Sequence, residues 1–440
     1  MASIRTLPWW DSRSRTVTVI TRAVEQLSPN SVVAIAPCLE VYSNDQAMER
    51  TMENFFVELE APHPHCVKNI VFGGKLPKRG LRWEFVNELK PIDLYCYLYA
   101  KYGEPNGIQN FLRKDDSDNL IHWEWTLASE RGVVSILGMN FRTEVHLIGD
   151  FVDSGLTLEM FISQIKSDFK NYGKKISAFR LELEKWTRFF NPYSRIKSSV
   201  EQNFKQLDML DINPRRDRLP HPGEGTDFDE FKYRWQALNE RYSSAVGLVF
   251  GLRAMLPVLA ESFVNLLIFV LARPEIKAND RLFQNVVRQP IDVRVQMLSV
   301  HCIGFSNVVD YASEECKAFH TLMNDRNDLL HGNIEIPKLA MGDVYFRGKI
   351  PLFLQYEDMW SESIGASLRS IKFDTIRQDR KVVEDFINYL VGRLAPQYAE
   401  TIEHIASQRD LGMNIKTGRL GVLFSDQISD FRAVFKAGEP

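Results

Sequence analysis

The sequence predicts an α+β protein whose N-terminal domain contains an antiparallel meander and whose C-terminal domain is mainly α-helical. Three observations lead to this prediction. Strand-like stretches follow one another between residues 120 and 151, apolar residues recur at helical spacing from residue 156 to about 210, and residues 228–332 carry a nearly continuous helical pattern. A long helical connector joins the two domains in this prediction.

Length, composition and net charge limit the classes of protein to which this chain can belong. A chain of 440 residues is long enough for two or three domains. Hydrophobic residues make up 45% and charged residues 25%, which excludes a wholly disordered or fibrous chain. The net charge of −3 argues against a general nucleic-acid coat protein, so any contact with RNA must be local.

Cysteine usage and hydropathy predict a cytoplasmic protein. The five cysteines are odd in number and lack the spacing of metal ligands, as expected for reduced thiols. Residues 1–15 lack the apolar core of a signal peptide. The apolar segment 245–274 is interrupted by Arg253, Pro257 and Glu261, so we expect a buried helix and no membrane contact.

The N-terminal domain is expected to span residues 1–155. Ser43 stands where a helix cap would, ahead of residues 44–61, and residues 94–103 end a second helix. The β-branched segment 67–74, VKNIVFGG, predicts a strand. Three further strands are expected in LIHWEWTLAS, GVVSILGMNF and RTEVHLIGDF.

A helical connector and linker are expected over residues 156–227. Apolar residues recur there at helical spacing, from Phe161 to Phe190, with a break predicted near Asn191 and Pro192. The stretch NPRRDRLPHPGEGTD that follows is rich in proline and glycine, which is typical of an exposed linker.

The C-terminal domain is expected to span residues 228–410, with a tail over residues 411–440. Helical periodicity continues to residue 332. The segment 344–356, VYFRGKIPLFLQY, predicts a hairpin, and residues 380–394 return to helix.

The stretch RNDLLHG, residues 326–332, carries the strongest candidate site. Arg326 falls on the apolar stripe of its helix, and a guanidinium in that position needs an anionic partner. A second apolar helix, expected over residues 254–272, offers Glu261 and Asn265 on one face. The stripe that contains the arginine consists of Ala312, Cys316, Phe319, Met323, Arg326 and Leu330.

Two further polar residues share one side of the last turns of this helix with Arg326, within an arc of roughly 140°. Asn327 and His331 are four residues apart, and Gly332 is a natural residue for ending a helix. The helix dipole favours a charged imidazole at its C-terminus, which suits proton transfer. A purely structural interpretation stays open, in which Arg326 and Glu261 form an ion pair and His331 simply precedes the helix exit.

The motif resembles that of the HEPN superfamily, in which an arginine and a histidine separated by four residues end a helix packed on a helix with a buried glutamate. The resemblance covers about residues 240–400. It implies a helical bundle that dimerises and joins two motif copies into one RNA-cleaving site without metal or cofactor. Arg326 and His331 would be the catalytic residues, Asn327 their polar support, and Glu261 the residue that holds the arginine. The strand-like insertion after His331 departs from the family pattern.

The resemblance implies a cytoplasmic, homodimeric endoribonuclease of the toxin or antiphage type. RNA, with tRNA as one candidate, would be its substrate. An antitoxin, a regulatory partner or a trigger would control it, and residues 1–155 would serve as a sensor or regulatory domain. The alternative is a catalytically inactive module that binds nucleotides or RNA and dimerises, because some relatives have lost catalysis.

Weaker motifs favour no metal site. His63, His65 and Cys66 form half a ligand set, but no matching pair stands elsewhere, so we expect a surface loop. FGGK and KDDSDN are predicted to be turns. The basic segments 170–175, KNYGKK, and 214–218, PRRDR, are the first candidates for phosphate contacts.

Overall fold

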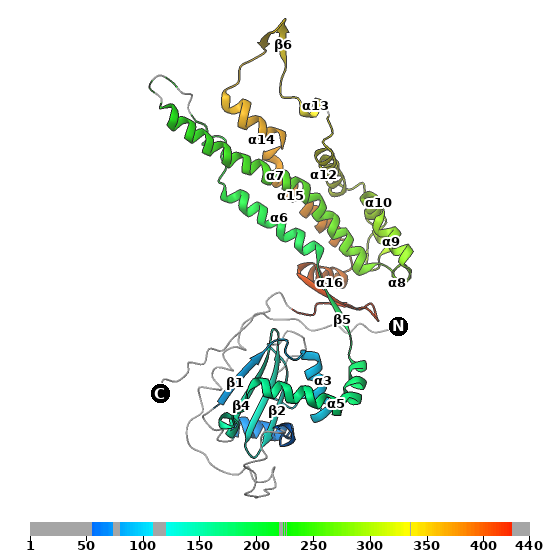
Figure 1. Cartoon of the computed structure of the whole chain (residues 1–440). Coiled ribbons are helices and arrows are strands. Elements are labelled where there is room, and N and C mark those ends of the chain that lie inside the picture. Colours follow the sequence, from blue (N-terminus) through cyan, green and yellow to red (C-terminus); the bar gives the residue numbers. More distant parts are fainter. Residues whose placement is uncertain are drawn as a thin grey trace. The chain divides into compact units, whose positions relative to one another are not determined.

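The structure, a computed structural model, describes residues 55–73, 80–108, 120–219, 227–334 and 336–424, together with residues 223 and 225. The chain divides into two compact units. The first comprises Met1–Leu183 with Ile428–Pro440, and the second comprises Glu184–Gln427. The N-terminal region contains an antiparallel sheet and the C-terminal part is helical (Figure 1), so the α+β class predicted from the sequence is confirmed.

The first unit is built on a four-stranded antiparallel sheet with the strand order β1-β4-β3-β2. Its last three strands are neighbours in the order of the chain, which confirms the predicted meander. The strands are β1 (Gly80–Phe85), β2 (Ile121–Ser129), β3 (Gly132–Met139) and β4 (Thr143–Gly149).

The apolar face of this sheet carries the core of the first unit. Alternate residues of the strands, such as Trp125, Ile136 and Val145, are fully buried. They share one cluster with Tyr97 and Phe161 from two helices. The helical segments of this unit are η1 (Phe55–Val57), α2 (Pro64–Gly73), α3 (Pro91–Tyr102), η2 (Asp150–Asp153) and α5 (Leu158–Glu182).

Residues 67–73 of the segment VKNIVFGG are helical, so the strand predicted there is wrong. Pro64 is the first residue of α2, a position where its missing N–H costs no hydrogen bond, and Val67 is fully buried. Packing therefore overrides the β propensity of the valines. The sheet takes instead the unpredicted strand β1, with the sequence GLRWEF.

The segment 156–227 is not a connector. Its first helix, α5, buries Phe161 in the core of the first unit. Residues predicted to continue that helix form β5 (Trp186–Phe190), which pairs antiparallel with β8 (Asp410–Asn414). The predicted break is confirmed, since α6 (Pro192–Met209) begins at Pro192, with the side chain of Asn191 accepting a hydrogen bond from the Tyr193 N–H.

The second unit is organised around one long helix, α7 (Phe228–Leu271), which continues through Pro257. The side chain of Asp227 caps its first turn. Helices α6, α12 (Glu314–His331) and α15 (Ile376–Val391) pack along α7. The rings of Phe319 and Phe386 stack 4.1 Å apart between α12 and α15. By length and composition α7 could cross a membrane, and 61% of its most apolar window is buried within the protein.

The remaining helical segments of the second unit are mostly short. They are α8 (Pro274–Lys277), α9 (Asp280–Arg288), α10 (Ile291–Gln296), α11 (Leu298–His301), α12 (Glu314–His331), α13 (Ile336–Leu339), η3 (Ser361–Gly365), α14 (Ala366–Ser370), η4 (Phe373–Thr375), α15 (Ile376–Val391) and α16 (Pro396–Ser407).

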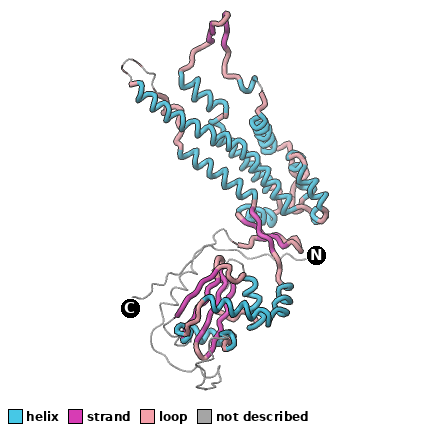
Figure 2. Tube along the Cα trace, in the orientation of Figure 1, coloured by secondary structure: helices cyan, strands magenta, loops and turns pink. Residues whose placement is uncertain are grey.

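The predicted hairpin is confirmed. Its strands β6 (Val344–Arg347) and β7 (Ile350–Phe353) pair antiparallel and project from the helices of the second unit (Figures 1 and 2). The tail predicted over residues 411–440, by contrast, begins inside strand β8, and Leu411 is buried. Strand β9 (Leu420–Gly421) pairs with β8 and completes that sheet. Of the helix expected over residues 44–61, residues 44–54 lie outside the described residues, and residues 55–61 contain only the short η1, so the helix predicted there is wrong. The KDDSDN turn, Gly74 and Lys75 also lie outside the described residues.

Candidate functional site

Helix α12 brings the RNDLLH motif to one end of the second unit. The Ser313 side chain accepts a hydrogen bond from the Cys316 N–H, 3.3 Å away, at the start of the helix. Gly332 ends it with φ 61°, a left-handed conformation, and its N–H bonds the Asp328 carbonyl. The predicted helix exit after His331 is thus confirmed.

Arg326 lies against Glu261 of α7. A guanidinium nitrogen is 3.6 Å from a carboxylate oxygen, and the two side chains are 18% and 25% exposed. The structure therefore brings together the arginine and the glutamate that the sequence analysis paired. At this distance the contact is an ion pair and not a close hydrogen bond.

A second guanidinium, which the sequence analysis missed, binds the same carboxylate. Arg294 of α10 donates hydrogen bonds to Glu261 and to Asn265, and its side chain is only 7% exposed. The i,i+4 pair of acceptors on α7 was visible in the sequence. Nothing in the short segment IDVRVQ indicated which helix would supply their donor.

The cluster of Glu261, Asn265, Arg294 and Arg326 carries more positive than negative charge. Two guanidiniums share one carboxylate, and Asn265 adds a neutral acceptor. The Nε atoms of both arginines are buried, and neither has a hydrogen-bond partner among the described residues. Such a cluster favours an anion, which would accept the unused donors and balance the charge.

Asn327 and His331 do not join this cluster. Asn327 is half-buried and His331 is exposed, and neither side chain has a hydrogen bond to a described residue. At about 100° per residue, they lie roughly 100° and 140° around α12 from Arg326. Within one chain, the imidazole therefore lies outside the cluster that holds the guanidinium.

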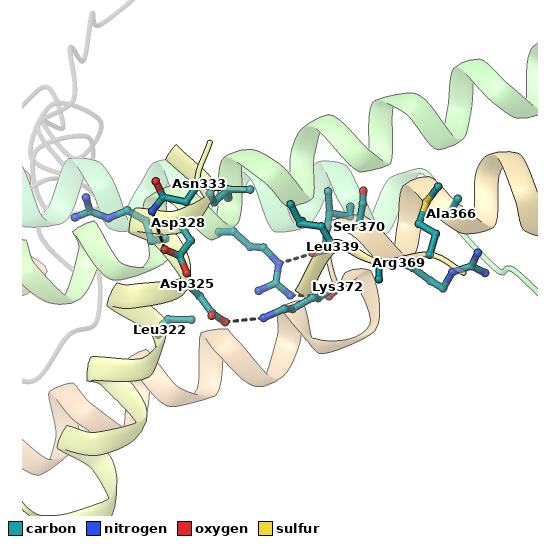
Figure 3. A pocket seen from close by; sticks show the side chains of 15 residues that line it. Leu322, Asp325, Asp328, Asn333, Leu339, Ala366, Arg369, Ser370 and Lys372 are labelled. Atoms are coloured by element: carbon teal, nitrogen blue, oxygen red, sulfur yellow. Dashed lines mark hydrogen bonds and ion pairs between the residues drawn. The ribbon is translucent and has the colours of Figure 1, made fainter. Parts of the chain in front are cut away.

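A cavity of about 330 Å³ lies beside the motif and is lined in part by Arg326. Asp325 and Lys372 reach toward one another in it, and their charged groups are 2.8 Å apart (Figure 3). The lining residues are Arg253, Leu322, Asp325, Arg326, Asp328, Leu329, Asn333, Leu339, Ala340, Met341, Ala366, Arg369, Ser370, Ile371 and Lys372.

Arg253 holds part of the lining of this cavity in place through hydrogen bonds. Its guanidinium donates hydrogen bonds to the carbonyls of Ile371 and Lys372, to the Thr375 hydroxyl and to the Asp379 carboxylate. Burial raises the pKa of Asp379, and the Arg253 charge opposes that shift. Arg253 therefore stabilises the fold and is not free to bind a ligand. The other cations on the lining of the cavity are Arg326, Arg369 and Lys372.

The arginines of the basic segment PRRDR make contacts within the protein. In PRRDR, Arg216 binds Asp211 and Asp217 at 2.9 and 3.0 Å, and Arg218 lies over the Trp360 ring at 5.0 Å. Their charges are thus partly neutralised.

The surface loop predicted for the PHPHC stretch is found only before Pro64, where α2 begins. His65 and Cys66 lie in α2, with the His63 and His65 rings stacked at 5.5 Å. Among the described residues there is no group of three ligand side chains that could hold a metal.

Comparison of the chain with protein-family models, curated proteins and solved structures found no match. Any function assigned to this site must therefore come from its residues and their geometry.

Proposed function

We propose that this chain is a metal-independent endoribonuclease that acts at a composite site made by two copies of the RNDLLH motif, as its resemblance to the HEPN superfamily implies. One observation carries the proposal: Arg326 is positioned by Glu261 within a cluster that has excess positive charge. A scissile phosphate is the kind of anion that such a cluster binds.

The residue types suit cleavage of RNA by its own 2′-hydroxyl. The 2′-oxygen attacks the phosphorus, the bond to the 5′-oxygen breaks, and a 2′,3′-cyclic phosphate and a 5′-hydroxyl result. A base must take the 2′ proton and an acid must protonate the leaving oxygen, which histidine can do. Arg326 and Asn327 would orient the phosphate and stabilise its growing negative charge.

A second copy of the chain has a defined role in this scheme. Within one chain, His331 lies about 140° around α12 from Arg326 and outside the cluster that holds the guanidinium. A homodimer would bring another His331 toward the phosphate held by Arg326. The helical packing around α7 would form the HEPN-like bundle of each copy.

The biological setting follows from the resemblance alone. We propose a cytoplasmic toxin or antiphage effector that cuts RNA, with tRNA as a candidate substrate. The first unit would sense a trigger or bind a regulatory or antitoxin partner.

The chemistry of the products tests the proposal. Purified chain is incubated with total RNA or tRNA in EDTA, and the fragment ends are identified. We expect 2′,3′-cyclic phosphates and 5′-hydroxyls, formed at the same rate with or without Mg²⁺. Fragments with 3′-hydroxyl ends that form only with Mg²⁺ would overturn the mechanism.

A non-catalytic module that binds nucleotides or RNA is the second candidate. The cavity beside Arg326, with Arg369 and Lys372 on its lining, favours this reading, because it offers cations and apolar side chains to a nucleotide. A chain that binds labelled RNA or ATP, and leaves RNA uncut under every condition above, would be this module.

A further inference from the structure

The hairpin of β6 and β7 is an apolar surface without a partner among the described residues. Every residue of both strands is exposed. An isolated two-stranded hairpin is marginally stable in water, and an open apolar edge tends to pair with another strand. Large apolar side chains with 45% to 67% exposure are Val344, Tyr345, Phe346, Ile350, Leu352 and Phe353.

The two edges of this hairpin differ. Arg347 pairs with Ile350 across a two-residue turn in which Gly348 has φ 66°, as a type II′ turn requires. In a hairpin with such a turn, the pair that flanks the turn, here Arg347 with Ile350, exchanges backbone hydrogen bonds. Because hydrogen-bonded and non-hydrogen-bonded pairs alternate, the backbone N–H and C=O groups of the next pair, Phe346 with Pro351, point away from the partner strand. Pro351 has no N–H to offer, and the outer edge of β7 is thereby blocked.

The outer edge of β6 remains open. By the same alternation, Val344 and Phe346 direct their N–H and C=O groups away from β7. We propose that this edge pairs antiparallel with β6 of a second copy of the chain, about a two-fold axis at Tyr345. In this register Val344 faces Phe346 of the second copy, and each such pair exchanges both of its backbone hydrogen bonds.

Charge complementarity selects this register and this partner. Asp343 precedes β6 and Arg347 ends it; both are exposed, and neither has an ion pair with a described residue. An axis at Tyr345 sets Asp343 of each copy opposite Arg347 of the other. An axis at Val344 would set Asp343 opposite Tyr345 and Arg347 opposite Met341. An axis at Phe346 would set Arg347 opposite Tyr345 and would set Asp343 against Lys349, which lies in the turn beyond the end of β6. Of these three axes, only the one at Tyr345 sets both charges against opposite ones. Opposite charges directly across a strand pair stabilise the sheet.

This contact deepens the proposed function, because a composite ribonuclease site requires a second copy. Only that link rests on the proposed function. The pairing of the hairpins itself follows from the open edge, the blocked edge and the complementary charges, whatever reaction the protein performs.

Disulfide trapping tests the two-fold axis. The axis passes through a non-hydrogen-bonded pair, in which Cα atoms are about 4.5 Å apart, within reach of a disulfide. Tyr345→Cys should therefore give a covalent dimer on mild oxidation. Leu352→Cys is the matched control, since Leu352 is the neighbour of Tyr345 on β7 and would lie one strand further out in each copy. Wild type oxidised in parallel shows any background from native cysteines. No covalent dimer from Tyr345→Cys, or equal yields from both variants, would overturn the proposal.

A charge-swap cycle tests the register in solution. Asp343→Arg and Arg347→Asp each place like charges opposite one another, and each should raise the dimer dissociation constant roughly tenfold by sedimentation equilibrium. The double variant restores opposite charges and should return to within about threefold of wild type. A wild-type chain that stays monomeric, or equal dissociation constants for all four proteins, would contradict the pairing. A monomer that binds anionic vesicles through the hairpin would assign this surface to a membrane instead.

RNA cleavage measured on the same preparations separates the two proposals. A dimer with these signatures that leaves RNA intact would reject the ribonuclease and keep the hairpin pairing. Cleavage by a dimer that Tyr345→Cys does not trap and that the charge swaps do not weaken would reject the hairpin pairing and keep the composite ribonuclease site.

Discussion

At the scale of single residues, Glu261 is the centre of the candidate site, because its carboxylate faces two guanidiniums from two other helices. Arg294 makes the closer contact and Arg326 the longer one. The sequence analysis could place Arg326 opposite Glu261 from the apolar stripe alone. It could not find Arg294, because only the folded chain shows where the short helix α10 packs against α7.

Glu261→Gln should lower the free energy of unfolding by about 1–3 kcal/mol, since it leaves the buried Arg294 and the partly buried Arg326 without an anion. The partial exposure of the glutamate keeps the loss below that of a fully buried pair. Urea denaturation measures the change. Glu384→Gln, which removes a surface ion pair with Arg380, is the control and should cost at most about 0.5 kcal/mol. Equal losses would show that Glu261 does not hold the arginines.

Lys372 has a strained backbone, with φ 50° in the left-handed region. Both Lys372→Gly and Lys372→Ala lose the ion pair with Asp325, so comparison of the two variants isolates the backbone contribution. The glycine variant should be more stable than the alanine variant by about 1 kcal/mol in urea denaturation. An alanine variant of equal or greater stability would contradict the strain.

At the scale of elements, strands β1 and β4 are joined by an ion cluster around Glu144. Burial alone would raise the pKa of Glu144, but hydrogen bonds from His146, Arg82 and Arg142 outweigh it and lower the pKa to about 2. Because the ordinary value is 4.5, the unfolded chain binds the proton more tightly than the folded chain. The stability from this carboxylate is complete above about pH 4.5 and is lost as the pH falls toward 2.

The urea midpoint of the full chain should show this dependence. The urea midpoint of wild type should exceed that of Glu144→Gln most at pH 5, and the difference between the two midpoints should shrink steadily as the pH is lowered to 3. The comparison with the glutamine variant removes the contributions of other carboxylates. A difference that stays constant over this range would contradict the lowered pKa.

The elements that the sequence predicted correctly are those whose signals are local. The end of α12 at Gly332, the start of α6 at Pro192 and the turn at Gly348 each depend on one residue with a restricted or unusual conformation. The elements that it missed depend on distant partners. Strand β5 pairs with β8, and Arg188 binds Asp410, more than two hundred positions further along the chain.

At the scale of the whole molecule, the division of the chain follows packing and not the change in periodicity. The sequence placed the end of the first domain at residue 155, where strand patterns give way to helical ones. Helix α5 nevertheless belongs to the first unit, because its apolar face completes the core of the sheet. Periodicity reports the type of an element, whereas burial decides the unit to which it belongs.

Charge is also distributed by the fold in a way that the sequence did not show. Composition gave a net charge of −3 and predicted only local contacts with RNA. The arginines of PRRDR, two of which contact acidic side chains of the second unit, are now weaker candidates for phosphate contacts. The excess positive charge around Glu261 is the better candidate, and it lies at the RNDLLH motif.

The central claim is that His331 transfers protons during RNA cleavage, and the most direct test compares two histidines of the same helix. His331→Ala and His320→Ala each remove one exposed imidazole from α12, and only the first belongs to the motif. Initial rates of tRNA cleavage in EDTA are measured together with RNA affinity. We expect the cleavage rate of His331→Ala to fall about 100-fold to 10,000-fold, with RNA affinity unchanged and His320→Ala near wild type. Equal cleavage rates in both variants and the wild type would contradict it.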